Sequence, residues 1–298
     1  MKVLVTGGTG LIGQRLTNAL EERGDDVIIV SRSRSGESYI QWDPHDPSSL
    51  EIPSDTDAVV HLAGAPVFGQ RWSDDYKETI RQSRVDGTRT VVRAIENSDA
   101  DLKSFVSGSA SGYYGDRGDE VLTEESEPGE DFLAGVCADW EDEARAIEDG
   151  PDPAIVRTGV VLSTEGGALK RMLNPFPFVW PFHWGLGGPL GRGQQYFPWI
   201  HIEDEVRALL HLIDNERSGT FNLAAPNPVT NKQYTQALGS VLNRPTIFPL
   251  PYFVMYLLYG EAAGILWASQ RLQPETLEES GFEFKHSNIE DALNDLIG

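Results

Sequence analysis

Residues Lys2–Gly13 read KVLVTGGTGLIG, and this stretch decides the fold of the chain. The apolar run Val3–Val5 predicts a buried strand, and Leu16, Ala19 and Leu20 then recur at helical spacing. Three glycines in the pattern GxxGxxG lie between strand and helix, where the helix N-terminus offers free N–H groups and partial positive charge to a pyrophosphate. A purely structural turn would not need three glycines at this spacing. The stretch predicts dinucleotide binding by Gly7, Thr9, Gly10, Leu11, Ile12 and Gly13.

The composition is that of a soluble globular protein with an unusual charge. The 298 residues suffice for one large or two small domains, and 40% of them are hydrophobic. The net charge is −22, and only six of the 24 basic residues are lysines. This balance favours a surface adapted to very high salt, as in a halophile, over a merely acidic mesophilic protein. It also argues against a nucleic-acid partner, whose phosphates would be repelled.

Cysteine content and hydropathy bear on the compartment. The single cysteine, Cys137, excludes an internal disulfide and fits a reducing cytoplasm. Glycines interrupt the N-terminal apolar run at once, so we expect no signal peptide. The most apolar segment, 253–268, contains Gly260, Glu261 and Gly264 and is too short and interrupted to span a bilayer. We predict a buried helix there.

Strand and helix patterns alternate through the first half of the chain. This alternation predicts an α/β fold, a Rossmann-type doubly wound parallel sheet with helices on both faces. The expected strands are Val27–Val30, Ala58–Leu62, Phe105–Ser107, Ala154–Val156 and Thr220–Leu223, and the expected helices are Asp74–Ile95, Val136–Ile147 and Glu203–Leu212. Residues 1–162 with about 200–225 would form the cofactor domain. Residues 163–199 and 226–298 would form a smaller, mostly helical substrate lobe.

The segment Met172–Trp199 is rich in proline, glycine and aromatic residues and has no helical or strand period. So many aromatic residues argue against disorder, and long irregular segments in compact domains are often functional. We favour a substrate-facing lid or wall over a packing or subunit-contact surface.

The end of the second strand bears on the choice of cofactor. NAD sites place a carboxylate about 20 residues after the glycines, to bind the ribose 2′-hydroxyl. Ser31 lies 18 residues after Gly13, and Ser31, Arg32, Ser33 and Arg34 include two guanidinium groups and no carboxylate. Because arginine binds phosphate through forked, charge-assisted hydrogen bonds, this favours NADP(H) over NAD(H). Solvated loop arginines are the alternative.

The chain resembles the extended short-chain dehydrogenases/reductases, and more narrowly their atypical "epimerase family" branch with a small C-terminal domain. The matching motifs cover nearly the whole chain: TGGTGLIG, HLAG (61–64), SRVDGT (83–88), SGSASGYYG (107–115), CADWE (137–141), RTGVVLS (157–163), WIHIED (199–204) and FNLAAPNPVTN (221–231). The resemblance implies that Leu62, Ala63 and Gly64 line the cofactor, and that Ser109 hydrogen-bonds a substrate hydroxyl or carbonyl.

The chain departs from the extended family at its catalytic motif, YxxxK. Alignment of the helix through Trp140 and Glu141 places Leu133 at the tyrosine position and Cys137 at the lysine position. Leucine carries no transferable proton, and an unactivated thiol is mostly neutral. The resembled branch shares this loss, so another group must move the proton if the chemistry is retained.

Two neighbouring tyrosines are the candidates for that role. Tyr113 and Tyr114 follow the strand that carries Ser109, and either phenol serves as acid or base if a neighbour lowers its pKa. Arg84 stands where extended members often have asparagine and is the proposed neighbour and cofactor contact. Packing by both tyrosines, with hydrogen-bonded hydroxyl groups, is the alternative.

Four other residues have open roles. Arg157 and Thr158 end a strand at the expected cleft, where the family contacts the nicotinamide; a buried ion pair is the alternative for Arg157. We expect His201 to be structural or to contact substrate rather than to bind metal, because no ligand cluster with suitable spacing accompanies it. Cys137 is interpreted as a buried small side chain rather than a reactive thiol.

The sequence therefore predicts an NADP(H)-dependent oxidoreductase or epimerase acting on a small, partly apolar alcohol or carbonyl. The alternative is a non-catalytic NADP(H)-binding or redox-sensing protein that has lost the YxxxK chemistry. We expect a cytoplasmic monomer or homodimer with no metal, no nucleic-acid partner and no membrane span.

Overall fold

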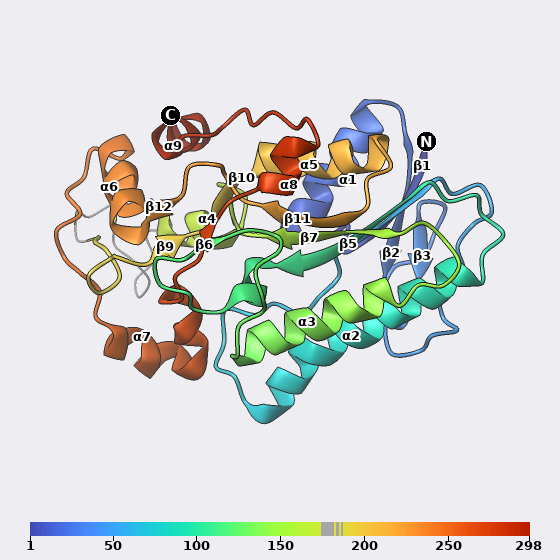
Figure 1. The fold of residues 1–298 in the computed structure, drawn as a ribbon, viewed down its shortest axis with the longest axis horizontal. Helices are drawn as coiled ribbons and strands as arrows, with labels where there is room; N and C mark the ends of the chain where they lie inside the picture. The colour runs from blue at the N-terminus through green and yellow to red at the C-terminus, as the bar shows by residue number, and fades with distance from the viewer. Residues whose placement is uncertain (174–181, 183–184, 186) are drawn as a thin grey trace.

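A parallel seven-stranded sheet forms the centre of the molecule (Figure 1). The computed structural model describes residues 1–173, 182, 185 and 187–298. The strand order is β11-β7-β5-β4-β1-β2-β3, with every pairing in this sheet parallel. The strands are β1 (Lys2–Thr6), β2 (Asp26–Ser31), β3 (Tyr39–Gln41), β4 (Ala58–His61), β5 (Ser104–Ala110), β7 (Pro153–Thr158) and β11 (Gly219–Leu223). The predicted doubly wound fold is confirmed.

Helices cover both faces of the sheet. On one face lie α1 (Leu11–Glu22), α5 (Ile202–Asp214) and the short α8 (Glu275–Glu279); on the other lie α2 (Asp74–Glu96) and α3 (Phe132–Arg145). Alternate residues of β1 point to opposite layers: Val3 and Val5 belong to the first core and Leu4 to the second. The apolar strands are therefore buried on both sides, as parallel sheets require.

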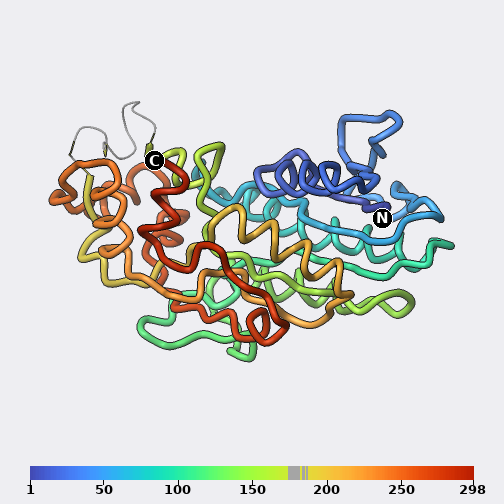
Figure 2. The backbone as a smooth tube through the Cα atoms, turned by 90° about the horizontal axis from the view of Figure 1, so that it is seen from above, coloured from blue at the N-terminus to red at the C-terminus, as the bar shows by residue number. Residues whose placement is uncertain are grey.

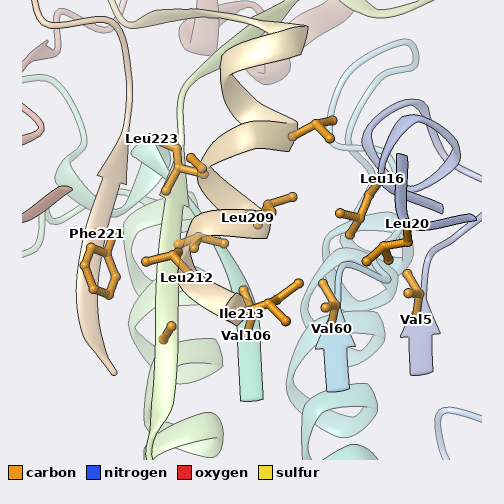
Figure 3. Close-up of a cluster of buried hydrophobic side chains, with 14 of the residues drawn as sticks. Val5, Leu16, Leu20, Val60, Val106, Leu209, Leu212, Ile213, Phe221 and Leu223 are labelled. Carbon is orange, nitrogen blue, oxygen red and sulfur yellow. The ribbon is translucent and has the colours of Figure 1, made fainter. Parts of the chain in front are cut away.

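The close-up in Figure 3 shows how the first face is filled. Leu16 and Leu20 of α1 and Leu209 and Ile213 of α5 pack over the strands, where Val60 and its neighbours meet them. These side chains recur every three to four residues along each helix, so that each helix turns one apolar side to the sheet. This packing holds the N-terminal ends of both helices at the carboxyl edge of the strands.

A smaller lobe lies beside that edge. It contains α4 (Gly167–Leu173), α6 (Asn231–Val241), α7 (Tyr252–Tyr259) and α9 (Ile289–Ile297), and the short pairs β8 (Val160–Leu162) with β10 (Trp199–His201), β9 (Tyr196–Phe197) with β12 (Val229–Thr230), and β6 (Val121–Leu122) with β13 (Arg271–Leu272). Its own core is built around Trp199, Tyr234, Leu238 and Leu293. Seen from above, the C-terminal stretch runs beside α5 before it reaches α9 (Figure 2). The predicted domain boundaries stay a prediction, and α8 packs on β11 of the main sheet.

Two local predictions are corrected. The apolar segment 253–268 is not a buried helix: α7 ends at Tyr259, a 3₁₀ helix (Gly260–Leu266) follows, and Phe253 and Leu257 are 69% and 71% exposed. Gly260 ends α7 in the left-handed region, with φ of +61°. Helix α3 begins four residues earlier than expected, because the Asp131 carboxylate caps it by accepting from the Ala134 N–H.

The proposed lid falls largely on residues 174–181, 183–184 and 186, which lie outside the described part of the chain. Within the described part, no helix is both long and apolar enough to cross a membrane.

Candidate functional site

The glycine loop between β1 and α1 is a tight backbone cradle. Gly7 has φ of +71°, and a Cβ there would lie 2.7 Å from the Leu62 carbonyl carbon. A Cβ on Gly13 would lie 2.2 Å from the Gly7 carbonyl oxygen. Gly10 closes the loop by donating its N–H to the Gly7 carbonyl at 2.9 Å, and no side chain caps α1. The glycines therefore let the loop pack tightly at the start of α1, whose first N–H groups are of the kind that binds anions.

The predicted segment after β4 lies against this cradle. The Leu62 N–H donates to the Thr6 carbonyl at 3.2 Å, and the Ala63 N–H donates to Thr6 Oγ1 at 3.3 Å. Gly64 continues along the same edge, where the Arg84 guanidinium carbon lies 3.2 Å from the position of a Cβ on Gly64. The fold therefore brings together the glycine loop and Leu62–Gly64.

His61, directly before this segment, is a structural histidine. Its Nδ1 lies 2.6 Å from Thr6 Oγ1, and its Nε2 lies 3.0 Å from Thr88 Oγ1. Burial lowers the pKa of His61 to about 3, so the ring is neutral at physiological pH. Edge-on contacts with Trp42 and Trp140 complete its surroundings.

The end of β2 leaves a guanidinium exposed beside a hollow. Arg32 and Ser33 are exposed, and the Ser33 N–H donates to Ser31 Oγ at 3.4 Å. Arg34 instead lies over the Tyr39 ring and donates to its hydroxyl group at 3.3 Å. The hollow beside β2 is lined by Arg32, Gln41, Trp42, Asp43, Pro44, His45 and Ser49. Of the two arginines, only Arg32 is among the residues that line this hollow.

A buried ion pair lies behind the predicted catalytic residues. Arg157 on β7 donates to both carboxylate oxygens of Glu141 on α3, with each distance 2.8 Å. Ser109 on β5 donates to Glu141 Oε1 at 2.6 Å. Arg157 also donates to the Tyr114 hydroxyl oxygen at 2.9 Å and to the Glu124 carbonyl at 3.0 Å. The donors of Arg157, which we predicted for the cofactor, are instead directed into the protein.

The two tyrosines have different surroundings. Tyr114 is fully buried, and its hydroxyl group donates to Asn222 Oδ1 at 2.7 Å. Burial outweighs Arg157 and raises the pKa of Tyr114 to about 12. Tyr113 is half-buried, and its ring lies 3.4 Å from the guanidinium carbon of Arg157. Burial also raises the pKa of Tyr113.

Arg84 is not the neighbour of these tyrosines, which corrects that part of the prediction. Its guanidinium lies over the Trp140 ring and donates to the Ile80 and Ala65 carbonyl groups. The positive charge next to the tyrosines comes from Arg157. A lowered pKa was the condition for either phenol to serve as acid or base, and neither phenol meets it, because desolvation disfavours the phenolate more than Arg157 favours it.

The positions that replace the YxxxK pair do face the loop after β5. A Cβ on Gly112 would lie 3.6 Å from Leu133 Cβ and 3.7 Å from Cys137 Sγ. Cys137 is buried, and this raises the pKa of its thiol to about 12. The thiol stays protonated, as expected for a packed side chain rather than a reactive one.

The sequence reasoning gave no role to two buried carboxylates. Glu141 stood inside a quoted motif, but only the fold reveals that it pairs with Arg157. Glu205 on α5 accepts from Thr158 Oγ1 at 2.9 Å, and burial raises its pKa to about 8. Its Oε2 is buried and has no hydrogen bond to any residue that the structure describes.

His201 does have companions with metal-ligating groups, contrary to the prediction. One ligand atom each from His201, Glu203, His286 and Asp295 forms a group within 4.8 Å of one another. His286 and Asp295 lie more than 80 residues along the chain, so no local spacing could reveal the cluster.

Comparison with known proteins identifies the family. Residues 3–224 match the model of the NAD dependent epimerase/dehydratase family, and residues 250–296 match a domain of unknown function, DUF1731. An epimerase family protein of Mycobacterium bovis is 41% identical over 98% of this chain and 96% of its own length. A chloroplastic homolog of epimerase family protein SDR39U1 from Arabidopsis thaliana is 39% identical over 100% of this chain and 87% of its own.

A solved structure is similar throughout. Human epimerase family protein SDR39U1, crystallised with NADPH, has a TM-score of 0.92 and 34% identity, covering 100% of this chain and 99% of that one. The glycine cradle and the parallel sheet described above are the features that an NAD(P)-binding fold requires. The chain belongs to the NAD-dependent epimerase/dehydratase family and carries a C-terminal DUF1731 domain.

Proposed function

We propose that this protein is an NADP(H)-dependent oxidoreductase or epimerase of the extended short-chain dehydrogenase type, acting on a small alcohol or carbonyl substrate. The observation that carries the proposal is the glycine cradle: only glycine at positions 7 and 13 lets the loop backbone pack this closely at the start of α1, because a Cβ would collide with the Leu62 or Gly7 backbone, and Leu62–Gly64 lies beside it. When bound there, the cofactor supplies or accepts a hydride at nicotinamide C4. The residues of this chain then bind and orient the reactants and move the proton.

The preference for NADP(H) is supported by the end of β2. Arg32 is exposed beside the hollow there, while Arg34 is engaged by Tyr39. Ser31 and Ser33 put hydroxyl groups next to Arg32, and no carboxylate stands at 31–34 to repel a 2′-phosphate. The human relative was crystallised with NADPH, which agrees with this preference.

Tyr113 is the better candidate for moving the proton. Tyr114 is fully buried with both hydroxyl functions used, by Asn222 as acceptor and by Arg157 as donor, so it positions Arg157 rather than touching substrate. Tyr113 is only half-buried, and its raised pKa keeps the phenol protonated at neutral pH. In the reducing direction, the phenol gives its proton to the substrate oxygen while the carbonyl carbon receives the hydride. The Ser109 hydroxyl group donates its single proton to Glu141 Oε1 at 2.6 Å, so we assign Ser109 to positioning Glu141 rather than to polarising that oxygen.

Cofactor titration tests the first part. In molar KCl we expect NADPH to bind at least 10-fold more tightly than NADH, and Arg32→Ala to remove most of that difference, since charged hydrogen bonds contribute about 1.5–3 kcal/mol. Arg34→Ala is the matched control and should change the ratio less. Equal binding of both nucleotides by the wild type would contradict the assignment.

Turnover tests the second part. In a screen of carbonyl compounds with NADPH, Tyr113→Phe should lower kcat by about 100-fold or more with the NADPH affinity retained. Tyr114→Phe should lower the stability of the protein but reduce kcat less than Tyr113→Phe does. Undiminished turnover in Tyr113→Phe would exclude the phenol as the acid.

A non-catalytic NADP(H)-binding or redox-sensing protein is the second candidate. It is favoured by Leu133 and Cys137 at the positions of the catalytic pair, with the thiol held protonated by burial. This candidate predicts tight NADPH binding with no turnover across the screen, and no effect of Tyr113→Phe on any measured property of the cofactor complex.

A further inference from the structure

A cluster of two histidines and two carboxylates joins the start of α5 to the C-terminal stretch. His201 and Glu203 stand at the start of α5, His286 lies in the loop before α9, and Asp295 lies on α9. The views in Figures 1 and 2 place the C-terminal stretch beside α5. One ligand atom from each residue lies within 4.8 Å of the others, and among the described residues no other such group is found.

The hydrogen bonds assign a role to each histidine. His201 Nδ1 accepts the Glu203 N–H at 3.0 Å, so the proton of the neutral ring is on Nε2. That Nε2 is buried, makes no hydrogen bond within the described part of the chain and lies 3.3 Å from Asp295 Oδ2. His286 Nε2 lies 3.2 Å from Glu203 Oε2, and the two imidazole rings stack with centroids 3.8 Å apart.

We propose that His286 Nε2, Glu203 and Asp295 bind one divalent transition-metal ion of the Zn²⁺ type, with His201 as the residue that orients Asp295. Imidazole and carboxylate together suit ions of this class, at about 2.0–2.2 Å from each ligand atom. Groups that share such an ion must lie within about 4 Å of one another, and these need only small side-chain movements to do so. The unpartnered Nε2–H of His201 gains an acceptor when the ion fixes the Asp295 carboxylate, as supporting hydrogen bonds do at metal sites.

The solvent exposure of the two carboxylates and the ammonium group already bound to one of them also fit a cation site. The side chains of Glu203 and Asp295 are 39% and 50% exposed, so an ion can enter from solvent, while His286 is 7% exposed and stays fixed. In the present arrangement the Lys285 ammonium group binds both oxygens of Glu203 at 2.8 Å. Lys285 is itself 54% exposed and free to swing away. Asp204 is not available, because it accepts the backbone N–H groups of Lys285 and His286.

Metal binding here would tie the C-terminal domain to the helix that covers the cofactor sheet. Glu203 is part of α5, whose later turns pack on that sheet, and Asp295 is on α9 of the small lobe. Because only the folded chain assembles the three ligands, the ion would stabilise the folded state. The inference does not depend on the proposed catalytic function.

Calorimetric titration of the full-length protein with ZnCl₂ in molar KCl tests the proposal, because salt suppresses loose binding to the acidic surface. We expect one saturable ion per chain and a thermal midpoint raised by roughly 5 °C at 100-fold excess over Kd. Asp295→Asn and His286→Ala should each weaken binding by 10-fold or more. Asp291→Asn, on the same helix and exposed, is the matched control and should bind as the wild type does.

Two further variants keep the result clear if His286→Ala unfolds. Lys285→Ala removes the competing ammonium group and should strengthen Zn²⁺ binding. His201→Gln should weaken it by less than His286→Ala does, since His201 is not a ligand. No saturable binding by the wild type, or equal binding by wild type and Asp295→Asn, would overturn the proposal. Equally tight binding of Ca²⁺ would do the same, because that ion prefers oxygen ligands alone.

Discussion

Replacement of Glu141 by glutamine tests the buried ion pair behind the candidate catalytic loop. The Glu141 side chain is fully buried, and that of Arg157 is 3% exposed. Glu141→Gln keeps the shape and removes the charge, which leaves the Arg157 guanidinium buried and only partly paired by the Tyr114 hydroxyl group and the Glu124 carbonyl. Removal of one partner of a buried ion pair costs about 3–5 kcal/mol, because the other charge stays desolvated.

The same helix offers a matched control. Glu143 pairs with Arg89, whose side chain is 39% exposed, so Glu143→Gln should cost less than about 1 kcal/mol. Urea unfolding in molar KCl measures both losses in the free energy of unfolding. A double variant, Glu141→Leu with Arg157→Met, should recover part of the stability lost by Glu141→Leu alone. If Glu141→Gln lowers the free energy of unfolding no more than Glu143→Gln does, the buried pair of Glu141 and Arg157 does not contribute the stability expected of it.

Four further predictions concern the cradle, the buried titratable groups and the surface. Gly13→Ala forces a Cβ to within 2.2 Å of the Gly7 carbonyl oxygen, so NADPH binding measured by fluorescence should fall by at least 10-fold, and unchanged affinity would mean that the loop is not the phosphate site. Burial raises the pKa of Glu205 to about 8, above its usual ~4.3, so the stability that its proton provides is complete below about pH 4 and is lost as the pH rises toward 8. In the wild type this group should lower the free energy of unfolding by up to about 1.4 kcal/mol per pH unit between pH 5 and 8. Glu205→Gln should therefore make the urea midpoint depend less on pH over that range. Cys137, with a buried thiol whose pKa is raised to about 12, should resist iodoacetamide in the native state and react in urea, as followed by mass spectrometry. With a net charge of −22, the thermal midpoint should rise between 0.1 and 2 M KCl; a flat response would argue against salt adaptation.

The sequence alone determined the parallel sheet, because the signals for it are local. Val3–Val5, the glycines that follow and the apolar side of α1 are contiguous in the chain, and each obeys the geometry of a strand, a tight turn or a helix. The cradle could be predicted for the same reason. A Cβ at Gly7 or Gly13 is excluded by backbone a few residues away or by the neighbouring strand, which any doubly wound sheet places there.

Only the tertiary structure decided the burial and the partners of the candidate site residues. Tyr113 and Tyr114 are adjacent in sequence, yet one is half-buried and the other is fully buried, because the Tyr114 hydroxyl group meets Asn222, more than 100 residues away. The partner of Arg157 lies on another element, and two of the companions of His201, His286 and Asp295, lie more than 80 residues along the chain. A pKa depends on desolvation and on charges brought close by folding, and a helix is buried only if a neighbour covers it, so neither property is encoded in local spacing.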